Sequence, residues 1–123
     1  MSNVRFRYLY RDASNYKKWA DVVFSNGGRL SVGTAVRKLR KGLLYRDLLI
    51  ASQVRLPELF LFEECPATED DHCFHEFHSL EVTNDPATDR LGRSIGGLVM
   101  EVEWANKNGW RAFDPLDPWS HQP

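Results

Sequence analysis

The chain has 123 residues, of which 42% are hydrophobic and 27% charged, and its formal net charge is −1. This length suits one compact domain, and the composition excludes collagen-like, coiled-coil and intrinsically disordered classes. The isoelectric point is near 6.4, so no overall positive charge favours nucleic-acid binding, and no apolar run reaches the ~20 residues of a membrane-spanning helix.

The cysteine content and the first residues predict the compartment. Two cysteines, Cys65 and Cys73, are too few for the disulfide framework of a small secreted domain. The first residues lack the charged-then-apolar pattern of a secretion signal. We therefore expect a cytoplasmic protein with reduced thiols and no membrane attachment.

The near-neutral total conceals a strong asymmetry of charge along the chain. Residues 1–55 include 12 basic and three acidic residues, whereas residues 56–123 include four basic and 14 acidic ones. Three explanations stay open. The two halves could pack with complementary faces, two copies could pair basic face to acidic face, or the charge could serve a binding partner.

The first elements are predicted to form a β-hairpin. Apolar and mostly basic residues alternate over residues 4–11, which predicts a strand whose buried face consists of Val4, Phe6, Tyr8 and Tyr10. Residues 19–25 are apolar on both sides and predict a second strand that pairs with the first and is covered on both faces.

The middle of the chain predicts a short helix followed by less regular structure. Ser31 is expected to cap a helix that runs to about Lys41, with Gly42 as a left-handed C-terminal cap. Residues 43–54 favour a buried irregular run over an extension of the helix. Residues 59–62 are short and apolar on both sides, which predicts a strand.

The last third of the chain predicts a strand, a helix and a tail. Alternation over residues 73–83 predicts a strand with two opposite sets of side chains. One set is Phe74, Glu76, His78, Leu80 and Val82, and the other is Cys73, His75, Phe77, Ser79 and Glu81. Apolar residues at helical spacing predict a helix from Ser94 to about Lys107. Two prolines predict that residues 114–123 form an extended or disordered tail.

Together these elements predict the fold class and the domain organisation. The expected order is strand, strand, helix, short strand, strand, helix, which favours an α+β fold. We predict a single domain over residues 1–113, with a three- to four-stranded, mostly antiparallel sheet packed by two helices.

Residues 72–78 hold the densest set of chemically active side chains. His75, Glu76 and His78 are the weak catalytic candidates, since a histidine and a carboxylate on one face can share a proton. Cys73 and His75 are the metal candidates, because zinc accepts thiolate and imidazole ligands. A closed zinc site needs further ligands, so no cofactor is predicted and zinc stays the alternative. Histidines satisfied within the sheet or facing solvent explain the same pattern.

Two other segments are candidate binding sites. Arg11, Asp12, Asn15 and Tyr16 follow the first strand and could orient a phosphate or carboxylate ligand, or simply fix the hairpin turn. The outer face of the first helix carries four basic residues, which could follow a phosphate backbone or face solvent: Arg37, Lys38, Arg40 and Lys41. Because few aromatic residues accompany them, nucleic-acid binding is the less favoured prediction.

The segment from Tyr10 to Lys17 reads Tyr-Arg-Asp-Ala-Ser-Asn-Tyr-Lys and precedes a stretch ending in Phe24-Ser25-Asn26. It resembles the opening of a family of small uncharacterised bacterial proteins, and residues 71–77 and 105–110 look similar too. The family has no established activity. The resemblance therefore implies a bacterial, cytosolic origin and assigns no catalytic residue.

Three functions are compatible with these observations. The favoured one is a non-enzymatic module that binds a protein partner or a second copy of itself, because the charge is asymmetric and no complete catalytic set is present. The alternatives are a small histidine- or metal-assisted hydrolase that uses residues 72–78, and a weak nucleic-acid binder that uses the first helix.

Overall fold

The computed structural model of the chain describes residues 2–12, 15–60 and 72–112. Its four strands are β1 (Asn3–Arg11), β2 (Lys17–Phe24), β3 (Leu48–Leu49) and β4 (His75–Thr83). They form one sheet in the order β2-β1-β4-β3, and every neighbouring pair is antiparallel. With helices α1 (Val32–Gly42) and α2 (Ile95–Asn108), this arrangement confirms the predicted α+β fold.

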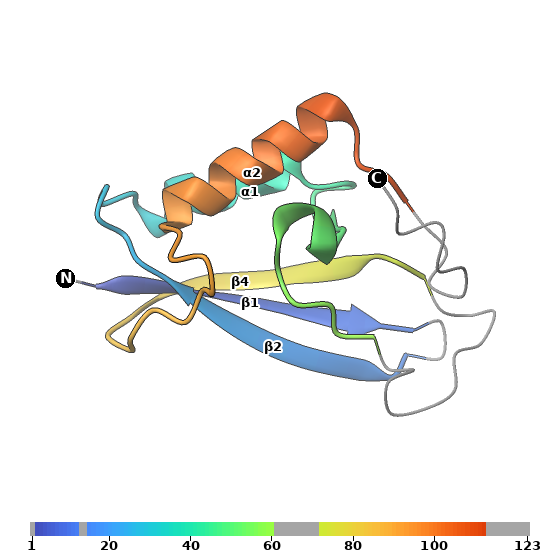
Figure 1. Ribbon diagram of the computed structural model, residues 1–123, viewed down its shortest axis with the longest axis horizontal. Coiled ribbons are helices and arrows are strands. Elements are labelled where there is room, and N and C mark those ends of the chain that lie inside the picture. The colour runs from blue at the N-terminus through green and yellow to red at the C-terminus, as the bar shows by residue number, and fades with distance from the viewer. Residues whose placement is uncertain (1, 13–14, 61–71, 113–123) are drawn as a thin grey trace.

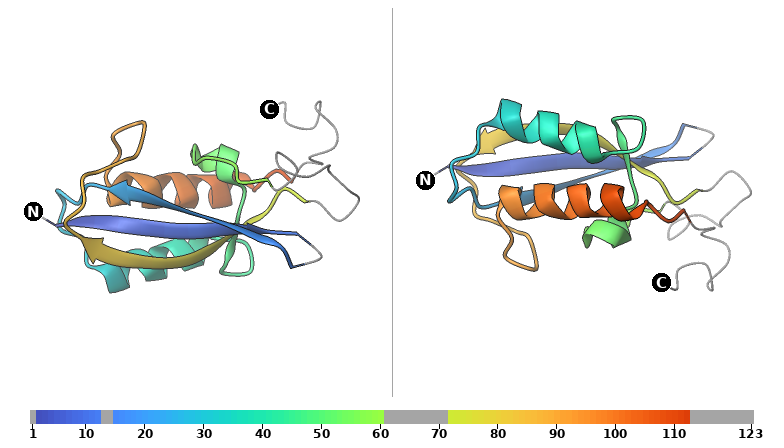
Figure 2. Two further views of the ribbon diagram at one scale, coloured as in Figure 1. Left: turned by 90° about the horizontal axis from the view of Figure 1, so that it is seen from below. Right: turned by 90° about the horizontal axis from the view of Figure 1, so that it is seen from above.

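Both helices lie on the same side of the sheet, as Figures 1 and 2 show. We call this side the covered face and the opposite side, which no described helix covers, the open face. On β1 the covered face carries Val4, Phe6, Tyr8 and Tyr10, each at most 2% exposed. Their alternation with Arg5, Arg7 and Arg11 confirms the predicted strand, because the side chains of successive strand residues point to opposite faces.

A β-bulge in β4 overturns part of the predicted alternation. The register with β1 shifts by one residue, since Arg7 pairs with Ser79 whereas Tyr8 pairs with Phe77, and His78 is the extra residue. Leu80 therefore joins His75 and Phe77 on the covered face, and the predicted grouping of Leu80 with Glu76 is wrong. Local alternation could not reveal this shift, because pairing with a distant strand determines it.

The two helices begin where the sequence predicts. The hydroxyl groups of Ser31 and Ser94 accept hydrogen bonds from the amides of Thr34 and Gly97, which satisfies donors that the first turn leaves free. Gly109, with φ of 85°, ends α2. The prediction that Gly42 is a left-handed cap is wrong, because Gly42 is the last residue of α1 and Leu43 is the cap.

Gly42 instead allows the two helices to approach closely. A Cβ atom at Gly42 would lie 2.8 Å from the Val102 side chain and 3.3 Å from the Val102 carbonyl oxygen. The Gly42 carbonyl also accepts a hydrogen bond of 2.9 Å from the indole of Trp110. The last residue of α1 is thereby tied to the segment that follows α2.

The chain between α1 and residue 60 is largely irregular, as expected, but it contains two short elements. β3 adds a two-residue edge to the sheet, and η1 (Ala51–Val54) is a single 3-10 turn. The predicted strand over residues 59–62 is wrong for Leu59 and Phe60, which are buried without strand structure; residues 61–62 lie outside the described residues. The Tyr8 hydroxyl donates to the Pro57 carbonyl at 2.7 Å and holds this run against the sheet.

Two further predictions concern the membrane and the C-terminal tail. Neither described helix combines the length and the apolar character needed to cross a membrane. The predicted tail, residues 114–123, lies outside the described residues, so its conformation and the limit of the domain stay predictions.

Candidate functional site

His75, the central residue of the 72–78 cluster, belongs to the core. It is 0% exposed, and its ring lies 5.3 Å from those of Tyr10 and Phe60. Its Nε2 accepts a hydrogen bond of 2.9 Å from the Leu59 amide, so Nδ1 carries the proton of the neutral ring. Burial lowers the pKa of His75 to about 4, against the opposing effect of the nearby Cys73 backbone. His75 thus fastens residue 59 to the sheet as a neutral group.

The other two catalytic candidates lie on the opposite side of the strand. The Glu76 carboxylate pairs with the Arg11 guanidinium at 2.8 Å on the open face. His78, on the bulge, is exposed and packs edge-on against the Trp19 ring at 5.0 Å. Because His75 points into the core and Glu76 out of it, the three side chains do not converge on one substrate position.

The metal candidates are both buried. Cys73 is 2% exposed and His75 is 0% exposed. In the ranges 2–12, 15–60 and 72–112, no three His, Cys, Asp or Glu side chains are grouped in a way that could hold a metal ion. Cys65 and Asp70, which could add ligands to a zinc site near Cys73, lie outside the described residues.

Arg11, Asp12, Asn15 and Tyr16 form the turn between β1 and β2. The Asp12 carboxylate accepts a hydrogen bond of 2.9 Å from the Tyr16 amide, and the Arg11 guanidinium donates to the Asn15 side-chain oxygen at 2.6 Å. Arg11 also pairs with Glu76, and the Arg11 carbonyl lies 2.6 Å from Nε2 of His72. The turn and the 72–78 cluster therefore meet, but the groups that could bind a ligand bind one another.

Part of the charge asymmetry along the chain is offset by ion pairs between the two halves. Arg5 pairs with Glu81 at 2.8 Å and with Asp85, Arg11 pairs with Glu76, and Arg55 pairs with Glu101. Basic residues of the first half thus meet acidic residues of the second. This arrangement supports the first of the three explanations, in which the halves pack with complementary faces.

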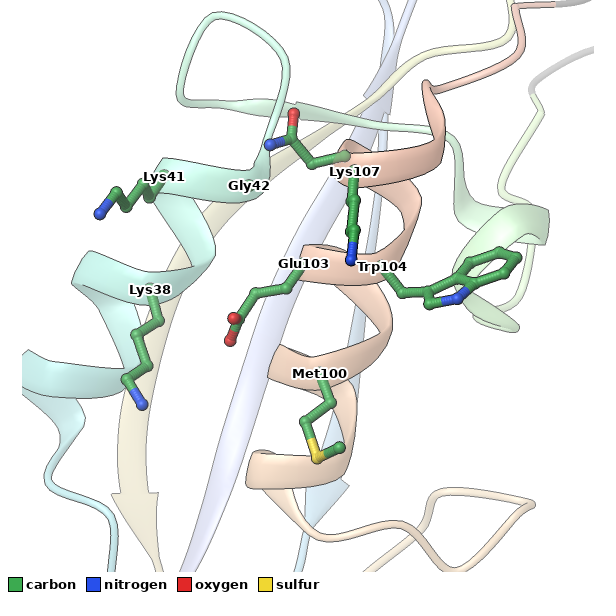
Figure 3. A pocket seen from close by; sticks show the side chains of 8 residues that line it. Lys38, Lys41, Gly42, Met100, Glu103, Trp104 and Lys107 are labelled. Atoms are coloured by element: carbon green, nitrogen blue, oxygen red, sulfur yellow. The ribbon is translucent and has the colours of Figure 1, made fainter.

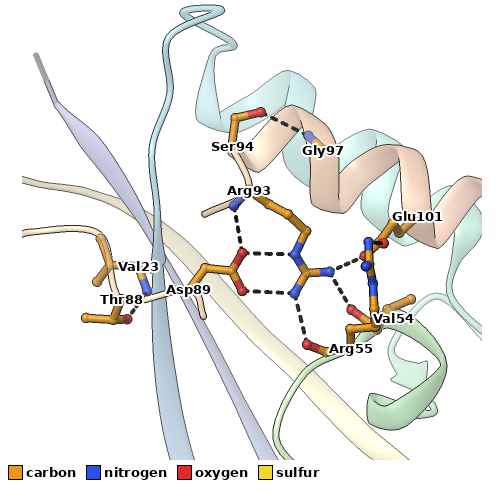
Figure 4. A network of polar contacts seen from close by, with 9 residues as sticks. All are labelled: Val23, Val54, Arg55, Thr88, Asp89, Arg93, Ser94, Gly97 and Glu101. Atoms are coloured by element: carbon orange, nitrogen blue, oxygen red, sulfur yellow. Dashed lines mark hydrogen bonds and ion pairs between the residues drawn. The ribbon is translucent and has the colours of Figure 1, made fainter. Parts of the chain in front are cut away.

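A buried arginine organises the region where α2 begins (Figure 4). Arg93 binds Asp89 through two nitrogens, each at 3.0 Å, and their side chains are only 8% and 4% exposed. The same guanidinium donates to the carbonyls of Val54 and Arg55 and pairs with Glu101. Hydrogen bonds from Arg93 hold the pKa of Asp89 below its usual value although burial opposes this. The network is internally satisfied and acts as a structural clamp.

A shallow cavity of about 610 Å³ lies along the outer side of the two helices (Figure 3). α1 contributes Lys38 and Lys41, and α2 contributes Met100, Glu103, Trp104 and Lys107. We call these six residues the helical face. Glu103 points toward α1, whereas the Trp104 ring leans to the other side of α2. Met100 and Trp104 are 70% and 63% exposed, so this part of the surface is apolar as well as basic.

Of the four residues proposed for nucleic-acid contact, three are accessible and one is engaged in an ion pair. Lys38 and Lys41 belong to the helical face, and Arg37 is exposed, with a hydrogen bond of 3.2 Å to the Thr34 hydroxyl. Arg40 is engaged, because it pairs with Asp47 at 2.5 Å and lies 5.1 Å above the Phe77 ring. The outer face of α1 thus has fewer available cations than its sequence indicates.

The turn after α1 continues this basic surface. Tyr45 and Arg46 both adopt positive φ, of 49° and 69°, which is uncommon for residues with a side chain. Tyr45 is 88% exposed and lines a cavity of about 530 Å³ with Arg37, Lys41 and Arg46. Arg40 supports the turn by donating to the Arg46 carbonyl at 3.1 Å. An aromatic ring therefore stands beside the basic end of α1.

Sequence reasoning missed Met100 and Trp104. Their spacing of four residues places them on one side of a helix, opposite the buried stripe of Leu98, Val102 and Ala105. A large apolar pair outside the core stripe was the available indication. No protein-family model, curated protein or solved structure matches this chain, so its function has to be inferred from its own residues.

Proposed function

We propose that the protein is a non-catalytic binding module whose helical face holds an acidic, partly apolar segment of a partner protein. The observation that carries this proposal is the exposed pair Met100 and Trp104 in a cavity that is also lined by Lys38, Lys41 and Lys107, three lysines that form no ion pair within the described residues. The partner segment contributes an apolar side chain and two or more carboxylates.

The apolar part of the helical face supports a protein partner. Tryptophan and methionine are enriched in the centres of protein–protein interfaces, and tryptophan is frequent among the residues that dominate binding energy. Met100 and Trp104 follow one another along α2 and are both more than half exposed. An apolar side chain of the partner that covers them removes this surface from water, which is favourable.

The basic part of the helical face supports an acidic partner. Across the part of the chain that the structure describes, Lys38, Lys41 and Lys107 form no ion pair. The arginines of the sheet contrast with them, because Arg5, Arg7 and Arg11 each bind a carboxylate. The charge of the three lysines is therefore available to a partner and can accelerate its approach.

The same surface favours a protein over a nucleic acid. Arg40, which a phosphate-binding helix would use, is already paired with Asp47. The hydrolase alternative has weaker support, since His75 is buried and uncharged at neutral pH while Glu76 lies on the other face of the sheet.

We also propose a bacterial, cytosolic setting for this module. The two cysteines are too few to stabilise a small secreted domain, and the Tyr10–Lys17 segment resembles small bacterial proteins. Fractionation of cells that express the tagged chain tests the compartment; recovery in the extracellular medium contradicts it.

A synthetic peptide tests the proposed function. We choose a fluorescein-labelled helix-forming peptide with leucine on one side and glutamate on the other, and measure its binding by fluorescence polarisation. The substitutions Trp104→Ala and Lys38→Glu are each expected to weaken binding by about tenfold, the usual effect of removing a dominant interface residue. Tyr16→Ala is the matched control, because Tyr16 is also an exposed aromatic residue and lies between β1 and β2, on neither helix.

Two results would contradict the proposal. One is peptide binding that Trp104→Ala leaves unchanged while circular dichroism shows a folded protein. The other is tighter binding of a single-stranded DNA oligonucleotide with the same number of negative charges, which would favour the nucleic-acid alternative. Loss of binding in high salt is expected in both cases, so salt dependence alone does not discriminate between them.

A further inference from the structure

The outer edge of β2 is only partly covered. β2 is a terminal strand of the sheet, because its one neighbour is β1. At one end of the strand, the amide of Val23 donates to the Thr88 hydroxyl, and the Val23 carbonyl accepts from the amides of Thr88 and Asp89. The Ser25 carbonyl likewise accepts from the Ile95 amide. The chain before α2 thus occupies this end of the edge.

The other end of the same edge is open. Main-chain groups of alternate strand residues point in the same direction, so Lys17, Trp19 and Asp21 direct theirs outward as Val23 does. Within residues 2–12, 15–60 and 72–112, no main-chain hydrogen bond occupies these outward groups. The three side chains are exposed and share the open face, because they stand opposite Arg11, Leu9 and Arg7 of β1.

We propose that a second copy of the chain binds this edge, with the two β2 strands antiparallel and related by a twofold axis at Trp19. In this register Trp19 faces Trp19 of the partner subunit, and Lys17 faces Asp21 of the partner subunit. About six main-chain hydrogen bonds form, and the two sheets become one continuous sheet. The interface is isologous, since each copy contributes the same residues.

Charge complementarity selects a second copy as the occupant. The twofold register brings each Lys17 ammonium opposite an Asp21 carboxylate, and opposite charges on directly facing residues stabilise a strand pair. Lys17 forms no ion pair within the described residues, whereas Asp21 already binds Arg7 at 2.9 Å and Arg5 at 3.6 Å. The ammonium of the partner adds a third cation beside a carboxylate that remains 36% exposed.

Trp19 marks the twofold axis without obstructing it. Its ring is 48% exposed and packs against His78, next to a cavity of about 510 Å³ that Arg7 and Asp21 also line. Because His78 belongs to β4, on the far side of β1, the ring leans over β1 and away from the outer edge, which leaves the main chain of β2 accessible to a second strand. A pairing of this length buries less than the ~1,600 Å² of a standard interface, so we expect a dimer that dissociates on dilution.

The test exploits the symmetry of the register. Lys17→Asp places two carboxylates opposite each other twice in the dimer, and Asp21→Lys does the same with two ammonium groups. Each variant alone is expected to be monomeric in sedimentation velocity over about a hundredfold range of concentration. An equimolar mixture restores both opposite-charge pairs and is expected to dimerise as the unchanged protein does.

Lys38→Asp is the control, because it makes the same change of charge on α1. It is expected to leave the dimer intact while it weakens binding of the acidic peptide, so failure of this inference and failure of the proposed function are distinguishable. If Asp21→Lys does not fold, hydrogen exchange of the unchanged protein replaces the mixing experiment. The amides of Trp19 and Asp21 are then expected to exchange more slowly as the protein concentration rises.

Three outcomes would overturn the inference. The first is an unchanged protein that stays monomeric throughout, which would mean that the charges on β2 protect an edge from association. The second is a dimer that Lys17→Asp leaves intact. The third is exchange of the Trp19 and Asp21 amides that does not depend on concentration.

Discussion

Phe6 and Arg7 are neighbours on β1, yet they lie in opposite environments on the two faces of the sheet. Phe6 is 2% exposed, and its ring lies 5.2 Å from that of Phe77 and 6.3 Å from that of Phe24. Arg7 is exposed and pairs with Asp21 at 2.9 Å. The covered face stabilises the fold by burying apolar surface, whereas the open face adds ion pairs that solvent screens.

A similar contrast separates the open face from the helical face. The arginines of β1 are matched to carboxylates on β2 and β4 and in the turn after β4, whereas the lysines of the helical face are not matched within the described residues. A charged surface is therefore informative about binding only after its internal pairs have been assigned. The +9 and −10 charges of the two halves of the sequence could not make that distinction.

The largest expected effect contrasts the two faces of β1 directly. Phe6→Ala removes a buried ring and is expected to lower the free energy of unfolding by about 3 to 5 kcal/mol. Arg7→Ala, one residue away, is expected to lower it by less than about 1 kcal/mol because an exposed ion pair contributes little. Urea denaturation monitored by circular dichroism measures both values. Equal losses would show that the open face is also covered in solution.

The second effect concerns the pH dependence of stability and contrasts two histidines of β4, the buried His75 and the exposed His78. Because the pKa of His75 in the fold, about 4, lies below the ordinary value of 6.5, the folded state disfavours the charged ring. Below pH 6.5 the unfolded state therefore binds a proton that the folded state does not bind. The free energy of unfolding is unaffected by His75 above that pH, and it falls as the pH drops from 6.5 toward 4. Stability is expected to be about 2 kcal/mol lower at pH 5 than at pH 7.5.

Substitutions at the two positions check this pH dependence. His75→Gln should flatten the dependence between pH 7.5 and pH 5, whereas His78→Ala, at the exposed position, should leave it parallel to that of the unchanged protein. Urea titrations at several pH values supply the comparison. If the pH dependence of stability disappeared in His78→Ala but persisted in His75→Gln, His75 would not be its source and the prediction would be wrong.

The smallest effect concerns the helix layer over the covered face. Gly42→Ala places a methyl group against the side chain and carbonyl of Val102, and is expected to destabilise the fold by about 1 to 2 kcal/mol through overcrowding. At Gly27 an added Cβ meets nothing within 4 Å, so Gly27→Ala should change stability by less than about 0.5 kcal/mol. Thermal melts distinguish the two variants; similar melting temperatures would mean that the helices can separate freely.

Features determined by nearby residues could be predicted from the sequence. The buried alternation of β1 and the serine caps of α1 and α2 depend on contacts within a few residues, and each was confirmed. The bulge at His78 and the edge strand β3 depend on pairing between segments far apart in the chain, which no local pattern specifies.

The candidate sites follow the same division. The sequence predicted that His75 faces away from Glu76 and His78, but it could not show that the Leu59 amide, Arg11 and Trp19 engage the three side chains separately. The helical face is assembled from α1 and α2, whose residues are more than 50 positions apart. Lys38 and Lys41 could be read from the sequence of α1, but their place in one cavity with Met100 and Glu103 depends on the packing of the two helices.

The hydrogen bonds of Arg93 limit which part of the β2 edge is accessible to another strand. Every nitrogen of that side chain donates to a residue of the loop before α2, of η1 or of α2 itself, so the loop that carries Thr88 is anchored from three directions. A lysine there could not reproduce a planar fork with that many donors. The anchored loop covers one half of the outer edge of β2. A strand that added to this edge could pair only with the half around Trp19.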